Sequence, residues 1–269
     1  LTVGVDCGKW NSHWVAVAQR DDGSYAIPAY GIFSVLHEQS DKVEQALLHA
    51  LRQFRDEVCE QGFPVDTSDG ATLPDAVGID IGYLPDAIAA FVRESGSMKR
   101  NRYRGCRGRG TSVMQQARHT QIKKKSDRKP LSGVQWFGEV NHERRVLEIT
   151  FDADYWKEFV HERWRTNQDS PGALAFFRPD TPKEHARISN HITNEQLVRD
   201  WQPGKGVVAK WVKTGENHFL DALAIAFVML DMTSRRRKIV KKAGPPSTSA
   251  GPEGLLMPDG RPFFDTSGN

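Results

Sequence analysis

Three aspartates stand where the sequence pattern predicts strand ends or the start of a helix. Asp6 follows the apolar run LTVGV, Asp80 follows AVGI, and Asp221 lies one turn into a predicted helix. Each could serve alone, because polar residues often close strands and an acid near a helix N-terminus is stabilised by the helix dipole. Their shared placement after short apolar segments favours instead one cluster of carboxylates.

Clustered carboxylates repel one another unless a cation neutralises them, and hard oxygen ligands select Mg²⁺ or Mn²⁺. Two such ions, roughly 3.5–4 Å apart, can activate water and stabilise the leaving oxygen in phosphodiester hydrolysis. We therefore expect Asp6, Asp80 and Asp221 to be metal ligands and catalytic residues, with two ions bound. Asn217 lies one turn before Asp221 on the same helix face, which predicts that it orients Asp221 from a second layer.

The elements that must position these acids follow from apolar periodicity and turn residues. In chain order we expect strands at 2–7, 13–19 and 25–33, a helix from about residue 41 to residue 62, a strand at 76–82 and a helix at 85–94. Strands at 134–138 and 145–151, a helix at 155–165, a strand at 207–212 and a helix at 217–232 follow. An antiparallel meander, a helix and then a strand is the early order of a ribonuclease H-like core, in which the first and fourth strands are neighbours. The predicted fold class is α/β, a ribonuclease H-like mixed sheet with antiparallel first strands, flanked by helices.

Three strings carry a more specific resemblance: GVDCGKW at 4–10, GIDIGYLPDAIAAFVR at 78–93 and WVKTGENHFLDALAIAFVML at 211–230. In order and spacing, over about residues 1–232, they resemble the acidic motifs of the nuclease domain of tailed-bacteriophage terminase large subunits, in the lambda-type packaging branch. The resemblance implies an endonuclease that cuts concatemeric double-stranded DNA during viral genome packaging, with Asp6 shared between two metals. It also implies a small-subunit partner, a portal ring and an ATPase domain N-terminal to this chain. This sequence departs at His218, where that branch often has Glu, so the resemblance assigns no role there.

A basic stretch runs from Lys99 to Lys129 and contains about a dozen Lys and Arg residues but only one acidic residue, Asp127. So dense a like-charged run favours an anionic partner such as the phosphate backbone, against the alternative of a solvated loop. The predicted DNA contacts are Arg100, Arg102, Arg104, Arg107, Arg109, Lys123, Lys124 and Lys125. Within this stretch GCRGRGTS has the spacing of a phosphate loop, but Thr111 stands where its lysine must be, so 105–112 is predicted to be a flexible loop near DNA.

Composition limits the remaining choices. The 269 residues contain no apolar run of the roughly 20 residues that a bilayer crossing needs. Three cysteines without CxxC spacing suggest neither a disulfide framework nor a thiolate zinc site, so we expect a soluble protein of the host cytoplasm. We expect residues 1–232 to form the nuclease domain and 233–269 a basic, then Pro/Gly/Ser-rich, flexible tail.

Three other functions remain open. A junction resolvase or transposase would keep the fold and the acids but prefer branched or end-specific DNA. An actin-like ATPase also opens with Asp-x-Gly, as Asp6 and Gly8 do, but the second phosphate loop and the adenosine motif that it needs are not recognisable. A DNA-binding module without catalysis would rest on the basic stretch alone.

Overall fold

The computed structural model describes residues 1–36, 42–65, 68–98, 102–115, 131–181, 183–204 and 206–242. The chain divides into two compact units, Leu1–Thr233 and Ser234–Asn269. All the strands described below lie in the first unit. Residues 234–242 of the second unit are helical, whereas the sequence predicts that the last helix ends near residue 232.

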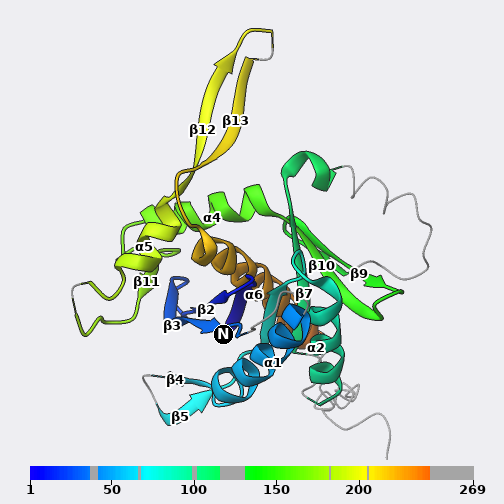
Figure 1. Cartoon of the computed structure of the whole chain (residues 1–269). Coiled ribbons are helices and arrows are strands. Elements are labelled where there is room, and N and C mark those ends of the chain that lie inside the picture. Colours follow the sequence, from blue (N-terminus) through cyan, green and yellow to red (C-terminus); the bar gives the residue numbers. More distant parts are fainter. Residues whose placement is uncertain are drawn as a thin grey trace, which may run out of the picture. The chain divides into compact units, whose positions relative to one another are not determined.

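A nine-stranded mixed sheet organises the described part of the first unit (Figure 1). Its order is β11-β3-β2-β1-β6-β7-β10-β9-β8. The strands are β1 (Thr2–Asp6), β2 (Asn11–Gln19), β3 (Tyr25–Ser34), β6 (Ala76–Asp80), β7 (Tyr103–Arg109), β8 (Leu131–Gly133), β9 (Trp136–Asn141), β10 (Val146–Asp152) and β11 (Leu174–Phe176). β1 to β3 form an antiparallel meander, and β6 lies parallel to β1. The predicted fold class is confirmed, including the pairing of the first and fourth strands of the core.

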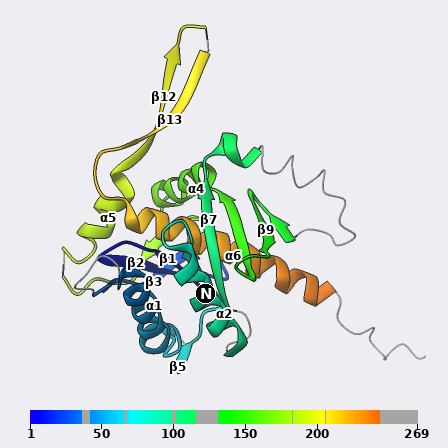
Figure 2. The ribbon, with the colours of Figure 1, turned by 45° about the vertical axis from the view of Figure 1, so that its right-hand side comes forward.

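Helices cover both faces of this sheet (Figures 1 and 2). They are α1 (Val43–Phe54), which continues as a π-helix η2 (Arg55–Cys59), α2 (Pro85–Met98), α4 (Ala153–Arg165), α5 (Ala186–Thr193) and α6 (His218–Lys242). Apolar residues of α1 and α2 pack on one face, and those of α4, α5 and α6 pack on the other. Among the described residues, no helix combines the length and apolarity that crossing a membrane requires.

Helix α6 lies unusually close to the two strands that carry the acids. A Cβ on Gly4 of β1 would collide with the backbone of Ala222, and one on Gly78 of β6 would lie 2.5 Å from Ile225. The hydroxyl of Thr2 also donates to the carbonyl of Ala226 at 2.8 Å, in a buried position. Glycine on the strands and alanine on the helix therefore allow α6 to sit directly on the sheet.

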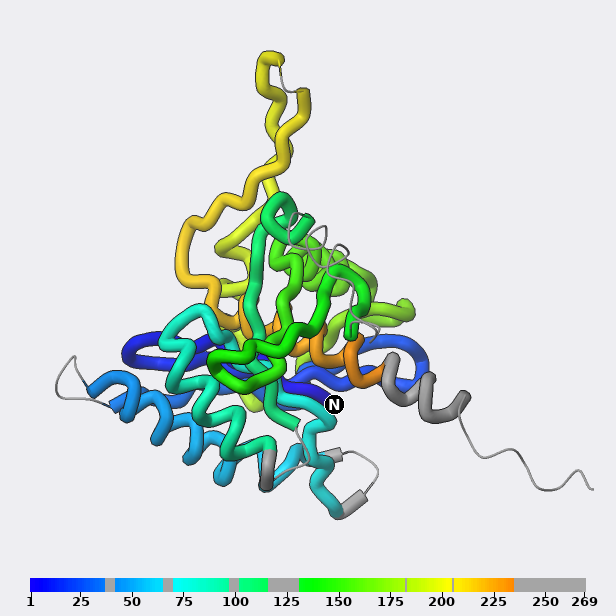
Figure 3. The backbone as a smooth tube through the Cα atoms, turned by 90° about the vertical axis from the view of Figure 1, so that its right-hand side faces the viewer, coloured from blue at the N-terminus to red at the C-terminus, as the bar shows by residue number. Residues whose placement is uncertain are grey.

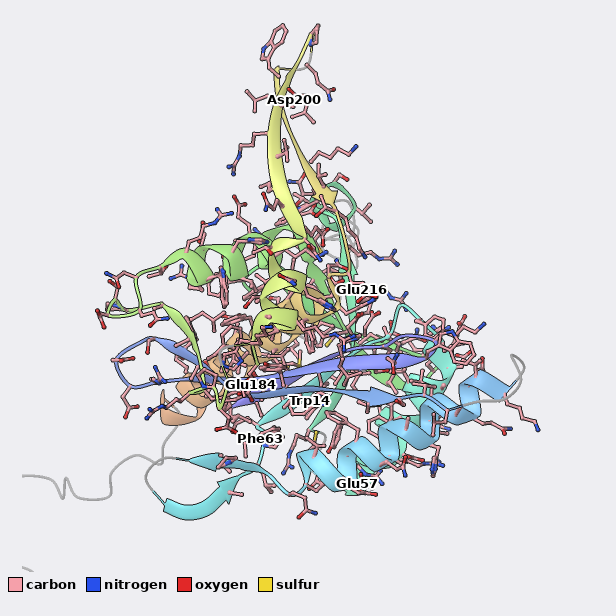
Figure 4. All side chains as sticks on the ribbon, turned by 60° about the vertical axis from the view of Figure 1, so that its left-hand side comes forward. Trp14, Glu57, Phe63, Glu184, Asp200 and Glu216 are labelled. Carbon is pink, nitrogen blue, oxygen red and sulfur yellow. The ribbon has the colours of Figure 1, made fainter. Side chains whose placement is uncertain are left out.

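Two hairpins extend from this core. One pairs β4 (Phe63–Val65) with β5 (Ser68–Thr72), and Phe63 packs near Trp14 of β2, as Figure 4 shows. The other pairs β12 (Glu195–Gln202) with β13 (Gly206–Lys213) and projects away from the sheet (Figure 3). Asp200 lies along this projecting arm (Figure 4), whereas the base of the arm joins α5 to α6. Glu195 and Lys213, paired across that base, thus lie near the start of α6.

The prediction of a flexible loop at 105–112 is wrong for most of this range. Residues 103–109 form β7, a strand inside the sheet with parallel neighbours β6 and β10. Its glycines do not mark a loop, because a Cβ on Gly105 would lie 2.8 Å from Ile81 and one on Gly108 would lie 3.2 Å from Phe151. These glycines instead provide room for large side chains that pack across the sheet.

Candidate active site

Asp6 and Asp80 lie at the same edge of the sheet. β1 and β6 run parallel, with Val5 paired to Ile79, so the next residue on each strand is an aspartate at the strand's carboxyl end. The backbone N–H of Gly82 donates to Oδ1 of Asp80 at 2.9 Å and fixes that carboxylate. The strand register therefore places two acids side by side, as the sequence predicts.

Asp221 reaches the same place from α6. The close packing of Gly4 and Gly78 against this helix holds its first turns over the strand ends. Asp6, Asp80 and Asp221 line one pocket of about 320 Å³. The structure thus brings together all three acids that the sequence analysis selects.

The electrostatics of the pocket fit a cation. Burial raises the pKa of Asp80 to about 6, the hydrogen bond from Gly82 opposes the rise, and the charges of Asp6 and Asp221 add to it. Burial also raises the pKa of Asp221, against the attraction of Lys157. Hard carboxylate oxygens on an open pocket are the donors that Mg²⁺ and Mn²⁺ prefer. The three aspartates could therefore hold a divalent ion.

A histidine group borders Asp6. His218 Nδ1 lies 2.8 Å from Asp6 Oδ2, and this hydrogen bond raises the pKa of His218 although burial opposes it. His13, opposite Asp6 on β2, stacks on His218 with ring centroids 4.7 Å apart. One potential ligand atom from each of Asp6, His13 and His218 falls within 4.8 Å of the others. Sequence reasoning left His218 without a role and missed His13; the only signal for His218 is its place three residues before Asp221.

A second polar group lies beside Asp221. Lys157 of α4 places its ammonium 2.8 Å from Asp221 Oδ1 and 2.7 Å from Glu195 Oε2. Burial disfavours the charge of Lys157, yet Asp221 and Glu195 outweigh it and raise its pKa. The sequence analysis identified neither Lys157 nor Glu195. Lys157 belongs to α4 and Glu195 to the base of the β12–β13 hairpin, and both are far from the acidic motifs in the sequence.

Asn217, the predicted second-layer residue, belongs to this group. The side chain of Asn217 is buried and donates to Glu195 Oε2 at 2.5 Å. Its backbone carbonyl accepts a hydrogen bond from the backbone N–H of Asp221 at 3.2 Å. Lys213 donates to Asn217 Oδ1 at 2.6 Å. The side chain of Asn217 thus reaches Asp221 only through Glu195 and Lys157, and its proposed orienting role stays a prediction.

The predicted DNA contacts lie in different environments. Arg109 is exposed and lines the pocket of the three acids. Arg102 pairs with Glu60 at 3.3 Å, Arg107 lies 3.5 Å from Glu148, and Arg104 is buried and donates to the carbonyl of Tyr103. Arg100, Lys123, Lys124 and Lys125 lie outside the described residues. Of the predicted contacts that are described, Arg109 is the one that lines the pocket.

Comparisons with known proteins give two likenesses of structure. The nuclease of the large terminase from the thermophilic phage G20c is 13% identical, with a TM-score of 0.38 over 84% of this chain and 80% of that one. The yeast mitochondrial Holliday junction resolvase is 10% identical, with a TM-score of 0.33 over 90% of this chain and 85% of that one. The resemblance predicted from the sequence is thus found among solved structures, at a level that carries no argument about activity. No family model matches the chain, and no curated protein matches it.

Proposed function

We propose that this chain is a divalent-metal-dependent endonuclease that cuts double-stranded DNA. One observation carries the proposal: three carboxylates from two parallel strand ends and a closely packed helix line a single pocket. A bound Mg²⁺ or Mn²⁺ ion would supply the charge that activates water and stabilises the oxygen leaving the phosphodiester. The carboxylates of the pocket repel a DNA phosphate, and a bound cation removes this repulsion. A bound metal therefore favours binding of DNA at this pocket.

The residues of the chain then have distinct tasks. Asp6, Asp80 and Asp221 hold the metal, and His218 fixes Asp6 through its hydrogen bond. Arg109 is exposed and lines the same pocket, so its side chain is available to pair with a phosphate of the substrate. In the two-ion form expected from the sequence, Asp221 must exchange its ion pair with Lys157 for a metal bond.

A plasmid assay tests the proposal. Supercoiled plasmid with Mg²⁺ or Mn²⁺, without ATP, should become nicked and then linear, and EDTA should prevent both products. Asp6→Asn, Asp80→Asn and Asp221→Asn should each abolish cleavage while the circular dichroism spectrum stays unchanged. The matched control is Asp200→Asn on the exposed β12 strand, which should cut at the parent rate. Cleavage at the parent rate by one of the three variants would remove that residue from the site.

The packaging role is the finer part of the proposal and rests on the three acidic motifs. By that resemblance the chain would cut concatemeric DNA in the host cytoplasm, together with a small subunit, a portal ring and an ATPase domain. A four-way junction offered beside a linear duplex of equal length separates this role from a resolvase. Comparable cutting of both substrates supports packaging, whereas strong preference for the junction would favour the resolvase. Binding without cleavage would leave a DNA-binding module.

A further inference from the structure

Lys157 lies in the acidic pocket itself. Its side chain is only 12% exposed, and its ammonium contacts Asp221 Oδ1 at 2.8 Å and Glu195 Oε2 at 2.7 Å. Lys157 lines the pocket together with Asp6 and Asp80. The ammonium therefore occupies space beside Asp221 that a metal ion bound by this carboxylate would need.

This position is fixed from several sides. Glu195 is buried, and its Oε2 accepts from both Lys157 and the side chain of Asn217. Asn217 is itself held by Lys213. Displacing Lys157 would leave Glu195 without its buried cationic partner, and a buried charge that loses its partner is strongly destabilising. The network thus favours an ammonium that stays beside Asp221.

The charges beside Asp221 point to one ion. Asp221 and the buried Glu195 share the ammonium of Lys157, so Asp221 already has a positive partner. A divalent ion bound by Asp221 would lie close to this ammonium in a partly enclosed site, where like charges are poorly screened.

We propose that Lys157 takes the place of the second metal ion. This revises the ligand set given above: Asp6 and Asp80 hold one divalent ion, and Asp221 pairs with Lys157 instead of binding metal. The inference rests on the proposed nuclease function. An ammonium has three N–H donors, and two of those of Lys157 are engaged by Asp221 and Glu195. The third can bond an oxygen of the phosphodiester beside Asp221. Lys157 thereby supplies fixed positive charge to the substrate and transfers no proton.

Counting bound Mn²⁺ tests the inference without relying on activity. Titration of the full chain with Mn²⁺, followed by electron paramagnetic resonance of the free ion and by calorimetry, should give one ion per chain. Lys157→Met, which keeps length but removes charge, should bind a second ion and lose plasmid cleavage. Lys157→Arg should still bind one. Lys210→Met, an exposed lysine of β13, is the matched control and should behave as the parent in both assays.

The outcomes separate this inference from the proposed function. Two ions bound by a parent that cleaves DNA would overturn the role of Lys157 and leave the nuclease intact. No ion bound and no cleavage would overturn the nuclease as well. A single ion in both the parent and Lys157→Met would also overturn the inference, because removal of the ammonium must open the second position. If Lys157→Met does not fold, the count for the parent still decides between one ion and two.

Discussion

His218 Nδ1 lies 2.8 Å from Asp6 Oδ2, so the first residue of α6 is joined to the last residue of β1. The same turn of α6 carries Asp221, and the contact therefore couples the position of that helix to the strand-end acid. A side chain that bonds a metal-binding carboxylate commonly sets its orientation. His218 thus takes part in the site although the resemblance to terminase nucleases assigns it no role.

Replacing His218 tests this coupling. His218→Ala should weaken Mn²⁺ binding by about 10–100-fold, the usual cost of losing such a supporting partner, because Asp6 is no longer held. His218→Asn, whose amide can still donate near the Nδ1 position, should recover part of the loss. His142→Ala, at an exposed histidine between β9 and β10, should change nothing. Calorimetric titration gives the affinities, and equal values for the two alanine variants would assign His218 to packing alone.

A second prediction separates Arg109, the last residue of β7, from Arg102, which precedes that strand. Arg109 is exposed at the pocket, whereas Arg102, just before the strand, is paired with Glu60. Each phosphate contact contributes about 0.9 to the slope of log affinity against log salt on duplex DNA. Arg109→Gln should therefore weaken binding and lower this slope by about 0.9, while Arg102→Gln should leave the slope unchanged. Fluorescence anisotropy of a short duplex in EDTA over a KCl series gives both slopes, and an unaltered slope for Arg109→Gln would remove it from the DNA contact.

The carboxylates were predictable because their signal is local. Asp6 and Asp80 each end a short apolar strand, and the meander–helix–strand order places these strands side by side. Asp221 was recognisable because the alanines beside it allow close packing on a sheet, and Gly4 provides the matching gap. Each acid is thus marked by the few residues around it, and the order of the predicted elements indicates the fold class.

The rest depends on contacts that no local pattern encodes. β7 was missed because its alternating arginines and glycines resemble a loop, although neighbours on both sides of the sheet bury Tyr103 and Cys106. Lys157 and Glu195 are separated by 38 residues and meet only when α4 and the base of the hairpin come together. A lysine on an amphipathic helix is usually solvated, so nothing in the sequence distinguished Lys157.

A third prediction concerns His13 and acid stability. His13 is buried, neither ring nitrogen has a hydrogen-bond partner among the described residues, and burial together with His218 and His191 lowers its pKa to about 3. A histidine in an unfolded chain has a pKa near 6.5, so between about pH 6.5 and pH 3 the unfolded state binds a proton that folded His13 does not bind. The contribution of His13 to stability is therefore complete above about pH 6.5 and is lost as the pH falls towards 3.

His13→Phe should remove this sensitivity. At pH 5 it should raise the free energy of unfolding by about 2 kcal/mol more than at pH 7.5, since each pH unit below 6.5 costs about 1.4 kcal/mol. His49→Gln, at an exposed position of α1, should leave the pH dependence as in the parent. Urea unfolding in EDTA at the two pH values measures the difference. Parallel loss of stability in the parent and in His13→Phe would show that His13 accepts a proton inside the fold.

The last prediction joins the metal site to stability through Asp80. Without metal, burial and the charges of Asp6 and Asp221 raise the pKa of Asp80 to about 6, against about 3.9 in an unfolded chain. A raised carboxyl pKa means that the charged form is disfavoured in the fold. The stability that this group contributes is present below about pH 3.9 and is lost as the pH rises through 6.

Asp80→Asn keeps an acceptor for the Gly82 N–H and removes the charge. In EDTA at pH 7.5 the variant should be more stable than the parent by on the order of 3 kcal/mol, and the difference should nearly vanish at pH 4. Asp6→Asn should gain less, because it weakens the hydrogen bond with His218. Mn²⁺ should reverse the order by stabilising the parent far more, since binding to the folded state adds its free energy to folding. Melting curves with EDTA and with Mn²⁺ test this prediction. If Mn²⁺ does not raise the melting temperature of the parent, or raises that of Asp80→Asn as strongly, Asp80 holds no metal.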